Sequence, residues 1–318
     1  MMFSKIIILT ILIAAVTLTS CNSSNSNKDP TDKILADTFQ GKWGYINSDG
    51  QIVIEPQFNN AGYFHNGIAK VSFRNKDGFI DKTGQLLFGR KFDSARDFSD
   101  GLAPVQIEGK WGYINNKGEV AINPQFEGAE SFHQGLANVK VNTKWGYIDK
   151  TGKVVIEPKS DLIGQFSEGF ALYSVGGNTG YIDKTGKMLI EYQFQHSWWF
   201  SEGLAPVEVE GKWGYIDKTG NLVIQPRFLN ADLFSEGVAC ALVITMTGPK
   251  WGYIDKTGDL VLDPQFTWAG TFSEGLAPVK VKGKYGFIDK TGKVVIKPAY
   301  AEAQSFSDGL AAVGGSEN

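Results

Sequence analysis

Residues 213–237 read WGYIDKTGNLVIQPRFLNADLFSEG, and this pattern recurs eight times along the chain with a period of 34 residues. One spacing of 38 interrupts the period, and the units open at Trp43, Asp77, Trp111, Trp145, Thr179, Trp213, Trp251 and Tyr285. A fixed period of this length indicates a repeat architecture, because each short unit must bury its apolar face against its neighbours. We therefore treat residues 34–318 as one repeat domain.

Each unit alternates residues that favour β-strands with residues that favour turns. In the sixth unit we predict a strand over 212–217, a turn over 217–220 and a returning strand over 222–225, since aromatic and β-branched residues favour strands. Asp217 can accept a backbone N–H at the turn, and Gly220 can adopt the positive φ that the turn needs. A further strand over 204–208 leads into a second hairpin turn at 210–212, so each unit should hold at least three antiparallel strands. The stretch 228–237 is predicted to form no more than a brief strand or helical turn.

The single change in length supports this division into hairpins. Four residues are added around 244–247, at the tip of the second predicted hairpin. Adding two residues to each arm preserves which side chains face the core, because strand side chains alternate with period two.

The fold class is therefore all-β, and two arrangements of the eight tandem antiparallel hairpin repeats remain open. The units could stack as an open β-solenoid or superhelical array, or close into an eight-bladed β-propeller-like ring. The repeat runs in register almost to the last residue without an atypical cap, which favours closure. Against closure, 34 residues is short for a four-stranded blade, and residues 309–311 begin a ninth copy of the strand that starts at Leu204. We expect the open array, with the closed ring as the alternative.

The motif Lys-Trp-Gly, seen for example at residues 42–44 and 212–214, resembles that of the bacterial WG-repeat, or KWG-repeat, proteins. The resemblance covers residues 41–318, and Phe-Ser-Glu-Gly-Leu-Ala recurs in phase with it. It implies an exported or cell-surface β-repeat protein and brings no defined reaction. The chain departs from the pattern at four positions that leave the packing of their units open: Asp77, Thr179 and Tyr285 replace Trp, and Ser160 replaces an aromatic residue.

The N-terminal residues have the features of an export signal. Lys5 precedes an apolar run over 6–16, and Leu-Thr-Ser-Cys follows at 18–21. This arrangement resembles the lipobox of bacterial lipoproteins, which implies that residues 1–20 are a lipoprotein signal peptide and that Cys21 carries lipid after cleavage. An uncleaved signal anchor is the alternative, although the apolar run is shorter than the ~20 residues of a membrane span.

Polar residues fill the segment that follows Cys21, so residues 21–33 should form a flexible linker between the lipid and the repeat domain. Two or more acyl chains anchor a protein stably to a membrane. We therefore expect a lipoprotein attached to a membrane of the bacterial cell envelope, at the outer membrane or the cell surface, through its lipid anchor.

Composition argues against several function classes. With 31 basic and 34 acidic residues, the net charge of -3 and the scattered Lys and Arg argue against a nucleic-acid partner. His65 and His133 occupy one repeat slot and are too far apart to share a metal, so we expect no metal and no cofactor. The acids at the twenty-fourth repeat position recur in most units, which favours a structural role, and no catalytic motif appears. We expect no enzymatic activity, and Cys240 reads as a small buried hydrophobe.

Candidate binding residues are those at which a unit departs from the shared pattern. Trp198, Trp199 and Trp268 lie outside the regular aromatic slots, and His196 lies beside the first two. They either fill gaps in the packing or form a candidate platform for a sugar ring or a partner protein.

Three functions follow from these observations. The first is a non-catalytic envelope scaffold that binds a protein or an envelope glycan, and the alternative is a purely structural envelope spacer. A propeller-type hydrolase would require convergent carboxylates in a central pocket.

Overall fold

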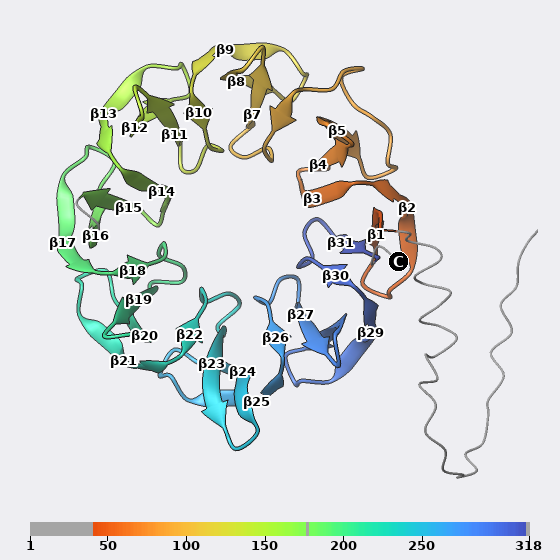
Figure 1. The fold of residues 1–318 in the computed structure, drawn as a ribbon, viewed down its shortest axis with the longest axis vertical. Coiled ribbons are helices and arrows are strands. Elements are labelled where there is room, and N and C mark those ends of the chain that lie inside the picture. The colour runs from red at the N-terminus through yellow and green to blue at the C-terminus, as the bar shows by residue number, and fades with distance from the viewer. Residues whose placement is uncertain (1–40, 176–177, 316–318) are drawn as a thin grey trace, which may run out of the picture.

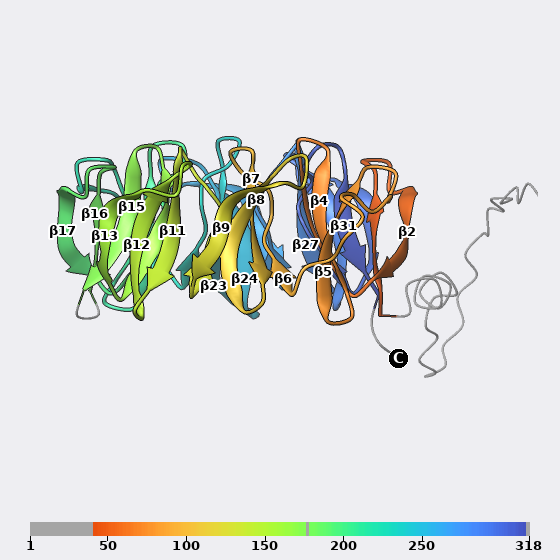
Figure 2. The same cartoon turned by 90° about the horizontal axis from the view of Figure 1, so that it is seen from above.

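The computed structural model describes residues 41–175 and 178–315, so the predicted signal peptide, Cys21 and the linker lie outside the described residues. All regular secondary structure in these residues is β-strand, in eight sheets placed around a common axis (Figure 1). The turned view shows a flat ring about one strand length thick (Figure 2). In the described part of the chain no helix is long and apolar enough to cross a membrane. The architecture is an eight-bladed β-propeller.

We number the blades along the chain and give their strands from the axis outward. Blade 1 contains β3 (Asn60–His65), β4 (Ile68–Phe73) and β5 (Lys76–Asp81). Blade 2 contains β6 (Ser94–Ala95), β7 (Leu102–Ile107), β8 (Lys110–Asn115) and β9 (Val120–Phe126). Blade 3 contains β10 (Gly128–Ala129), β11 (Leu136–Val141), β12 (Lys144–Asp149) and β13 (Val154–Ser160). Blade 4 contains β14 (Leu162–Ser167), β15 (Phe170–Val175), β16 (Asn178–Ile182) and β17 (Met188–Phe194).

The second half of the ring follows the same plan. Blade 5 contains β18 (His196–Ser197), β19 (Ala205–Val209), β20 (Lys212–Ile216) and β21 (Leu222–Phe228). Blade 6 contains β22 (Asn230–Ala231), β23 (Ala239–Thr245), β24 (Gly248–Ile254) and β25 (Leu260–Phe266). Blade 7 contains β26 (Trp268–Ala269), β27 (Leu276–Val281), β28 (Lys284–Asp289) and β29 (Val294–Tyr300). Blade 8 contains β30 (Glu302–Ala303), β31 (Ala311–Gly314), β1 (Trp43–Ile46) and β2 (Ile52–Phe58).

Blade 8 closes the ring because it takes strands from both ends of the domain. β1 pairs antiparallel with β31, with Trp43 opposite Gly314 and Ile46 opposite Ala311. The closed ring, our alternative, is therefore the architecture found, in place of the open array that the sequence led us to expect. The partial ninth strand beginning near residue 309, which we held against closure, is the partner that β1 needs. Each sequence unit is thus split between two blades, and a closed ring requires this extra strand.

The predicted hairpins are confirmed. Asp217 Oδ1 accepts the backbone N–H groups of Thr219 at 2.9 Å and Asn221 at 3.1 Å, and Gly220 has a φ of 86°. The strand predicted from Leu204 is β19, the second strand of its blade and not the innermost, which is the two-residue β18. The four added residues extend β23 and β24 by two pairs, Ile244 with Pro249 and Thr245 with Gly248, and leave the pairing of Leu242 with Trp251 in register.

The core consists of one apolar cluster at each of the eight interfaces between blades. Between blades 5 and 6, for example, Tyr215 and Phe234 are fully buried with their ring centroids 4.9 Å apart. The Tyr215 hydroxyl also donates to the backbone oxygen of Asp232 in the next blade at 2.7 Å. Gly214 is required because a Cβ there would lie 2.4 Å from the backbone oxygen of Ile224, where the outermost strand crosses it. The first half of each unit therefore packs against its own second half across a blade boundary.

In the units that depart from the repeat, side-chain hydrogen bonds take the place of the missing aromatic residue. Asp77 accepts hydrogen bonds from the Ser72 hydroxyl at 2.6 Å and the Ala95 N–H at 2.8 Å, where other units place an indole. The Thr179 hydroxyl donates to the backbone oxygen of Phe194 at 3.1 Å. The Ser160 hydroxyl, fully buried, bonds the backbone oxygens of Leu162 and Ser174. Hydrogen bonds thus replace apolar contacts at these slots.

Candidate functional site

The acids that recur at the twenty-fourth repeat position tie neighbouring blades together. The Glu202 carboxylate accepts the Gly237 N–H at 3.1 Å and pairs with Lys256 at 3.2 Å. The same bond to the next blade is made by Asp100, Glu168, Glu236, Glu274 and Asp308. Each of these residues has a positive φ, which is 52° for Glu202. The predicted structural role of these acids is confirmed.

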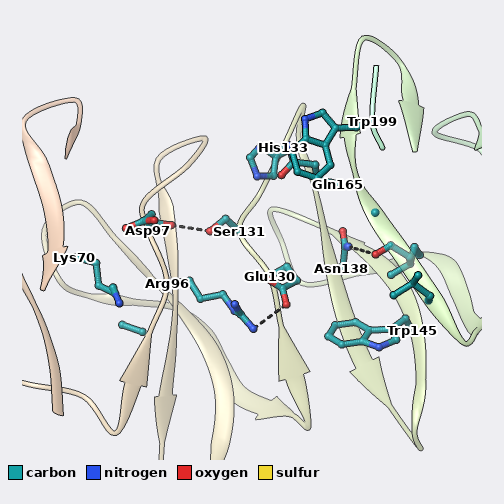
Figure 3. Close-up of a pocket in the computed structure, with 14 residues that line it drawn as sticks. Lys70, Arg96, Asp97, Glu130, Ser131, His133, Asn138, Trp145, Gln165 and Trp199 are labelled. Carbon is teal, nitrogen blue, oxygen red and sulfur yellow. Dashed lines mark hydrogen bonds and ion pairs between the residues drawn. The ribbon is translucent and has the colours of Figure 1, made fainter. Parts of the chain in front are cut away.

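A pocket of about 520 Å³ lies on the inner face of the ring, along blades 1 to 5. Its volume falls in the range of roughly 300–1,000 Å³ that small-molecule sites occupy. Figure 3 shows Trp199 above Trp145 on the right, with Asn138 and Glu130 at heights between them, and Lys70 and Asp97 on the left. We call this feature the inner-face pocket. Its polar lining includes Lys70, Arg96, Asp97, Glu130, Asn138 and Gln165.

A missing side chain in the neighbouring strand brings Trp145 to the pocket. Trp145 occupies the regular Trp slot at the start of β12, and its ring is half-buried. Gly128 faces it from β10, where a Cβ would lie only 3.1 Å from the Cη2 atom of the indole. The missing side chain at Gly128 lets one edge of the Trp145 ring reach the inner face.

Arg96 is fixed in position by three neighbours. Its guanidinium pairs with the Glu130 carboxylate at 2.8 Å and donates through Nε to the backbone oxygen of Ala129 at 2.9 Å. It also stands over the Trp111 ring, 5.5 Å from the centroid. Both members of the ion pair are more than a third exposed, so the pair contributes little to stability. Its main effect is to present donors and acceptors side by side at the pocket wall.

The charges around the pocket nearly balance. Lys70 and Arg96 are countered by the carboxylates of Asp97 and Glu130. Burial raises the pKa of the Asp97 carboxyl, although Lys70 and His65 oppose this shift, and its Oδ1 atom is buried without a hydrogen-bond partner. Burial also lowers the pKa of His133 below its ordinary value near 6.5, which keeps the imidazole neutral at pH 7. The lining is polar without a strong net charge.

Two amides complete the polar lining. Asn138 on β11 is 4% exposed, and its Nδ2 donates to the backbone oxygen of Ile163 at 3.3 Å. Other units place Pro104, Leu172 or Cys240 in this slot, so the amide belongs to this unit alone among them. Gln165 on β14 also lines the pocket, as do His133 and Trp199 (Figure 3).

The four candidate platform residues are not gathered in one place. Trp199 lines the inner-face pocket, whereas Trp198 is 46% exposed and does not, although the two rings meet edge to face with centroids 5.7 Å apart. His196 does not line the pocket either: it is exposed, and its Nδ1 lies 2.6 Å from the Glu208 carboxylate.

Trp268 belongs to a different blade and has a packing contact. Its ring meets Tyr285 edge to face, with centroids 5.3 Å apart, at the interface of blades 7 and 8. Tyr285 is one of the residues that replace Trp in the repeat, so Trp268 fills space beside a smaller ring. Cys240 is fully buried, and burial raises the pKa of its thiol. Cys21 lies outside the described residues.

Sequence reasoning missed most of the pocket. It looked for aromatic residues out of place, but Trp145 is in its regular slot and becomes accessible through Gly128. The missed polar residues occupy repeat positions whose residue type varies from unit to unit. This variation is the feature of the sequence that could have identified them as lining residues. Among the described residues, no group of three or more His, Cys, Asp or Glu side chains is placed to hold a metal ion.

Comparison with known proteins gives a match at the level of the repeat. The family model for the WG containing repeat matches eight segments: residues 43–76, 78–111, 111–145, 145–178, 180–213, 213–243, 251–285 and 285–314. No relative is found among the curated proteins.

Among solved structures, the chain is similar to a eukaryotic initiation factor at 12% identity, with a TM-score of 0.52, covering 83% of this chain and 86% of that one. It is also similar to Hsv2 of Kluyveromyces lactis at 12% identity, with a TM-score of 0.44, covering 62% and 72%. A further match is the extracellular domain of a putative hybrid two-component system from B. thetaiotaomicron, at 11% identity and a TM-score of 0.47, covering 84% and 43%. At such identities the first likeness concerns the fold alone, and the other two carry no argument.

Proposed function

This chain belongs to the family of proteins built from the WG containing repeat, and from that premise we propose that it is a non-catalytic binding scaffold of the cell envelope. Its ligand is a protein or an envelope glycan, taken up at the inner face of the ring. The observation that carries this proposal is the inner-face pocket, which gathers Trp199 and several polar side chains from slots where the units differ, together with the regular Trp145 that Gly128 leaves uncovered.

The contrast between shared and individual slots supports a binding role. Residues that recur, such as the acid at Glu202 and the glycine at Gly214, are engaged in joining blades and strands. Residues that do not recur, such as Asn138 and Trp199, line the inner-face pocket. A spacer would need only the first group.

The recurring carboxylates are held by backbone N–H groups outside the pocket. Two other carboxylates, Asp97 and Glu130, do line the pocket, but Glu130 is paired with Arg96, so we do not propose a hydrolase.

We further propose that lipid on Cys21 attaches the scaffold to a bacterial membrane. Its support is the lipobox-like sequence, with the polar linker as the spacer that follows it. Cys21→Ser removes the sulfur that would carry the thioether and should release the protein from membranes or stall its processing. A variant that still partitions into detergent and incorporates labelled fatty acid would contradict the anchor.

The binding role is tested with the fragment 22–318. It is immobilised and exposed to an array of envelope glycans and to solubilised envelope proteins, beside a copy carrying Trp199→Ala. Retention of a ligand by the original fragment and its loss from the variant would support the scaffold. A fragment that retains nothing from either source would leave the structural spacer as the better account.

A further inference from the structure

We propose that the inner-face pocket binds an uncharged saccharide, with one sugar ring laid against Trp199, another beside the uncovered edge of Trp145, and their hydroxyl groups bonded to Arg96, Glu130 and Asn138. This inference rests on the proposed binding function and names its ligand class.

The two indoles suit the apolar side of a sugar ring. A pyranose presents C–H groups on its faces and hydroxyl groups around its rim, so it needs flat apolar surface beside polar groups. An indole offers a broad apolar face and one N–H donor. Trp199 can supply such a surface and Trp145 adds the edge of a second indole in the same pocket, with polar side chains in the space between them (Figure 3).

The polar groups match hydroxyl chemistry. Each hydroxyl can donate one hydrogen bond and accept others, so a site for several hydroxyls needs donors and acceptors in alternation. Arg96 supplies only donors and Glu130 only acceptors, and their ion pair at 2.8 Å sets them side by side. Asn138 adds an amide that is held in place by its bond to the Ile163 backbone oxygen. This alternation is what a hydroxyl-bearing ligand requires.

The charge balance disfavours strongly charged ligands. A phosphate site gathers cationic side chains or backbone N–H groups that face the ligand. Here Arg96 is already paired with Glu130, and Lys70 lies close enough to Asp97 to oppose the rise in its pKa. His133 is neutral at pH 7 because burial lowers its pKa. The lining thus holds two cationic and two anionic side chains, whose charges offset each other.

An extended peptide fits the pocket less well. Peptides commonly bind by adding a strand to an exposed sheet edge, where main-chain hydrogen bonds give affinity. The innermost strands of blades 2 and 3 are β6 and β10, and each has only two residues. Such short edges offer little main chain for pairing. The innermost strand of blade 4, β14, is longer at six residues, but its own pairing with β15 is interrupted between Ile163 and Phe166. We therefore favour the saccharide.

The test is a calorimetric titration of fragment 22–318 with neutral disaccharides: cellobiose, maltose, lactose and N,N′-diacetylchitobiose. Glucose 6-phosphate and a pool of short peptides are titrated in parallel. We expect at least one neutral disaccharide to bind, and both Trp199→Ala and Asn138→Leu to weaken it by about tenfold or more. Leu is a safe replacement for the fold because Leu172 occupies the same slot in the next unit.

Trp198→Ala is the matched control, since Trp198 neighbours Trp199 but does not line the pocket, and it should leave the affinity within about twofold. Equal losses in Trp198→Ala and Trp199→Ala would place the ligand outside the pocket and overturn the proposal. Binding of the phosphate or peptides alone would overturn the saccharide while keeping the scaffold. Failure of every ligand, together with an empty envelope pull-down, would overturn both.

Discussion

Tyr45 and Ala312 lie opposite each other on β1 and β31, so the first complete strand of the domain is paired with its last. The neighbouring Trp43 ring lies against Gly314, where a Cβ would stand 3.0 Å from the indole. Both the strand ladder and a side-chain contact therefore join the two ends of the repeat domain.

Hydrogen exchange should report this closure. We predict that the amides of Gly44–Ile46 and Ala311–Val313 that point across the pair are protected as strongly as those of the equivalent pair in blade 5. Protection measures the free energy of local opening, and terminal strands without a partner open easily. Exchange at these ends that is much faster than in blade 5 would indicate an open array.

The interface clusters predict which substitutions damage the fold. Phe200 is fully buried between blades 4 and 5, with its ring 4.7 Å from that of Phe170 and 5.0 Å from that of Tyr181. Phe200→Ala should cost about 3–5 kcal/mol in unfolding free energy, measured by urea denaturation, because it leaves a cavity. His65→Ser is the control: His65 is exposed, and Ser restores the repeat's own residue. Equal destabilisation by the two changes would mean that the buried slots are misassigned.

Gly214 tests the close approach of the outermost strand. Gly214→Ala places a methyl group 2.4 Å from the Ile224 backbone oxygen, so we expect a loss on the order of 1–3 kcal/mol in the same assay. Gly211→Asn serves as the comparison. A Cβ added at Gly211 would have no atom within 4 Å apart from those of its chain neighbours, and Asn tolerates the positive φ of 75° found there. A larger loss for the Gly211 change would argue against the strand crossing.

Asp97 predicts a dependence of stability on pH. The pKa of its carboxyl is raised in the folded state, so the ionised carboxylate destabilises the fold. The destabilisation develops as the pH rises above the ordinary Asp pKa, and it is absent when the carboxyl is protonated in both states. Asp97→Asn should therefore raise the melting temperature at pH 7, and the gain should vanish below the ordinary Asp pKa of about 3.9.

Asp217 has the opposite shift, since the Thr219 hydroxyl and backbone N–H groups lower its pKa. Asp217→Asn should consequently lose stability at pH 7 and approach the original protein as the pH falls. The Asp97 prediction fails if its variant melts lower at pH 7 or if its gain persists in acid.

Local structure could be predicted from the sequence, whereas the closure of the ring could not. The turn at 217–220 and the tip at 244–247 follow from residues near each other in the chain. Closure depends on Trp43 meeting Gly314, a contact between the two ends that no local pattern encodes. We counted residues 309–311 as a surplus strand because we aligned blades with sequence units, and the structure divides each unit between two blades.

The pocket was predicted least well, for a related reason. Trp199 was found because it breaks the repeat. Trp145 obeys the repeat and reaches the pocket only because Gly128 leaves room for it. Arg96 and Glu130 belong to successive units, and only the curvature of the ring brings their charges to 2.8 Å. Slots that vary between units mark the inner face, but their spatial grouping needs the fold.

The most direct test of the proposed ligand site is a titration of the ¹⁵N-labelled indole groups. The chain has eight tryptophans, so the spectrum of fragment 22–318 should contain eight indole N–H signals that single substitutions can assign. On adding the neutral disaccharide that binds, we predict that the signals of Trp145 and Trp199 shift most, while those of Trp268 and Trp213 stay in place. Shifts confined to Trp198 and Trp268, with Trp145 unmoved, would contradict a saccharide site in the inner-face pocket.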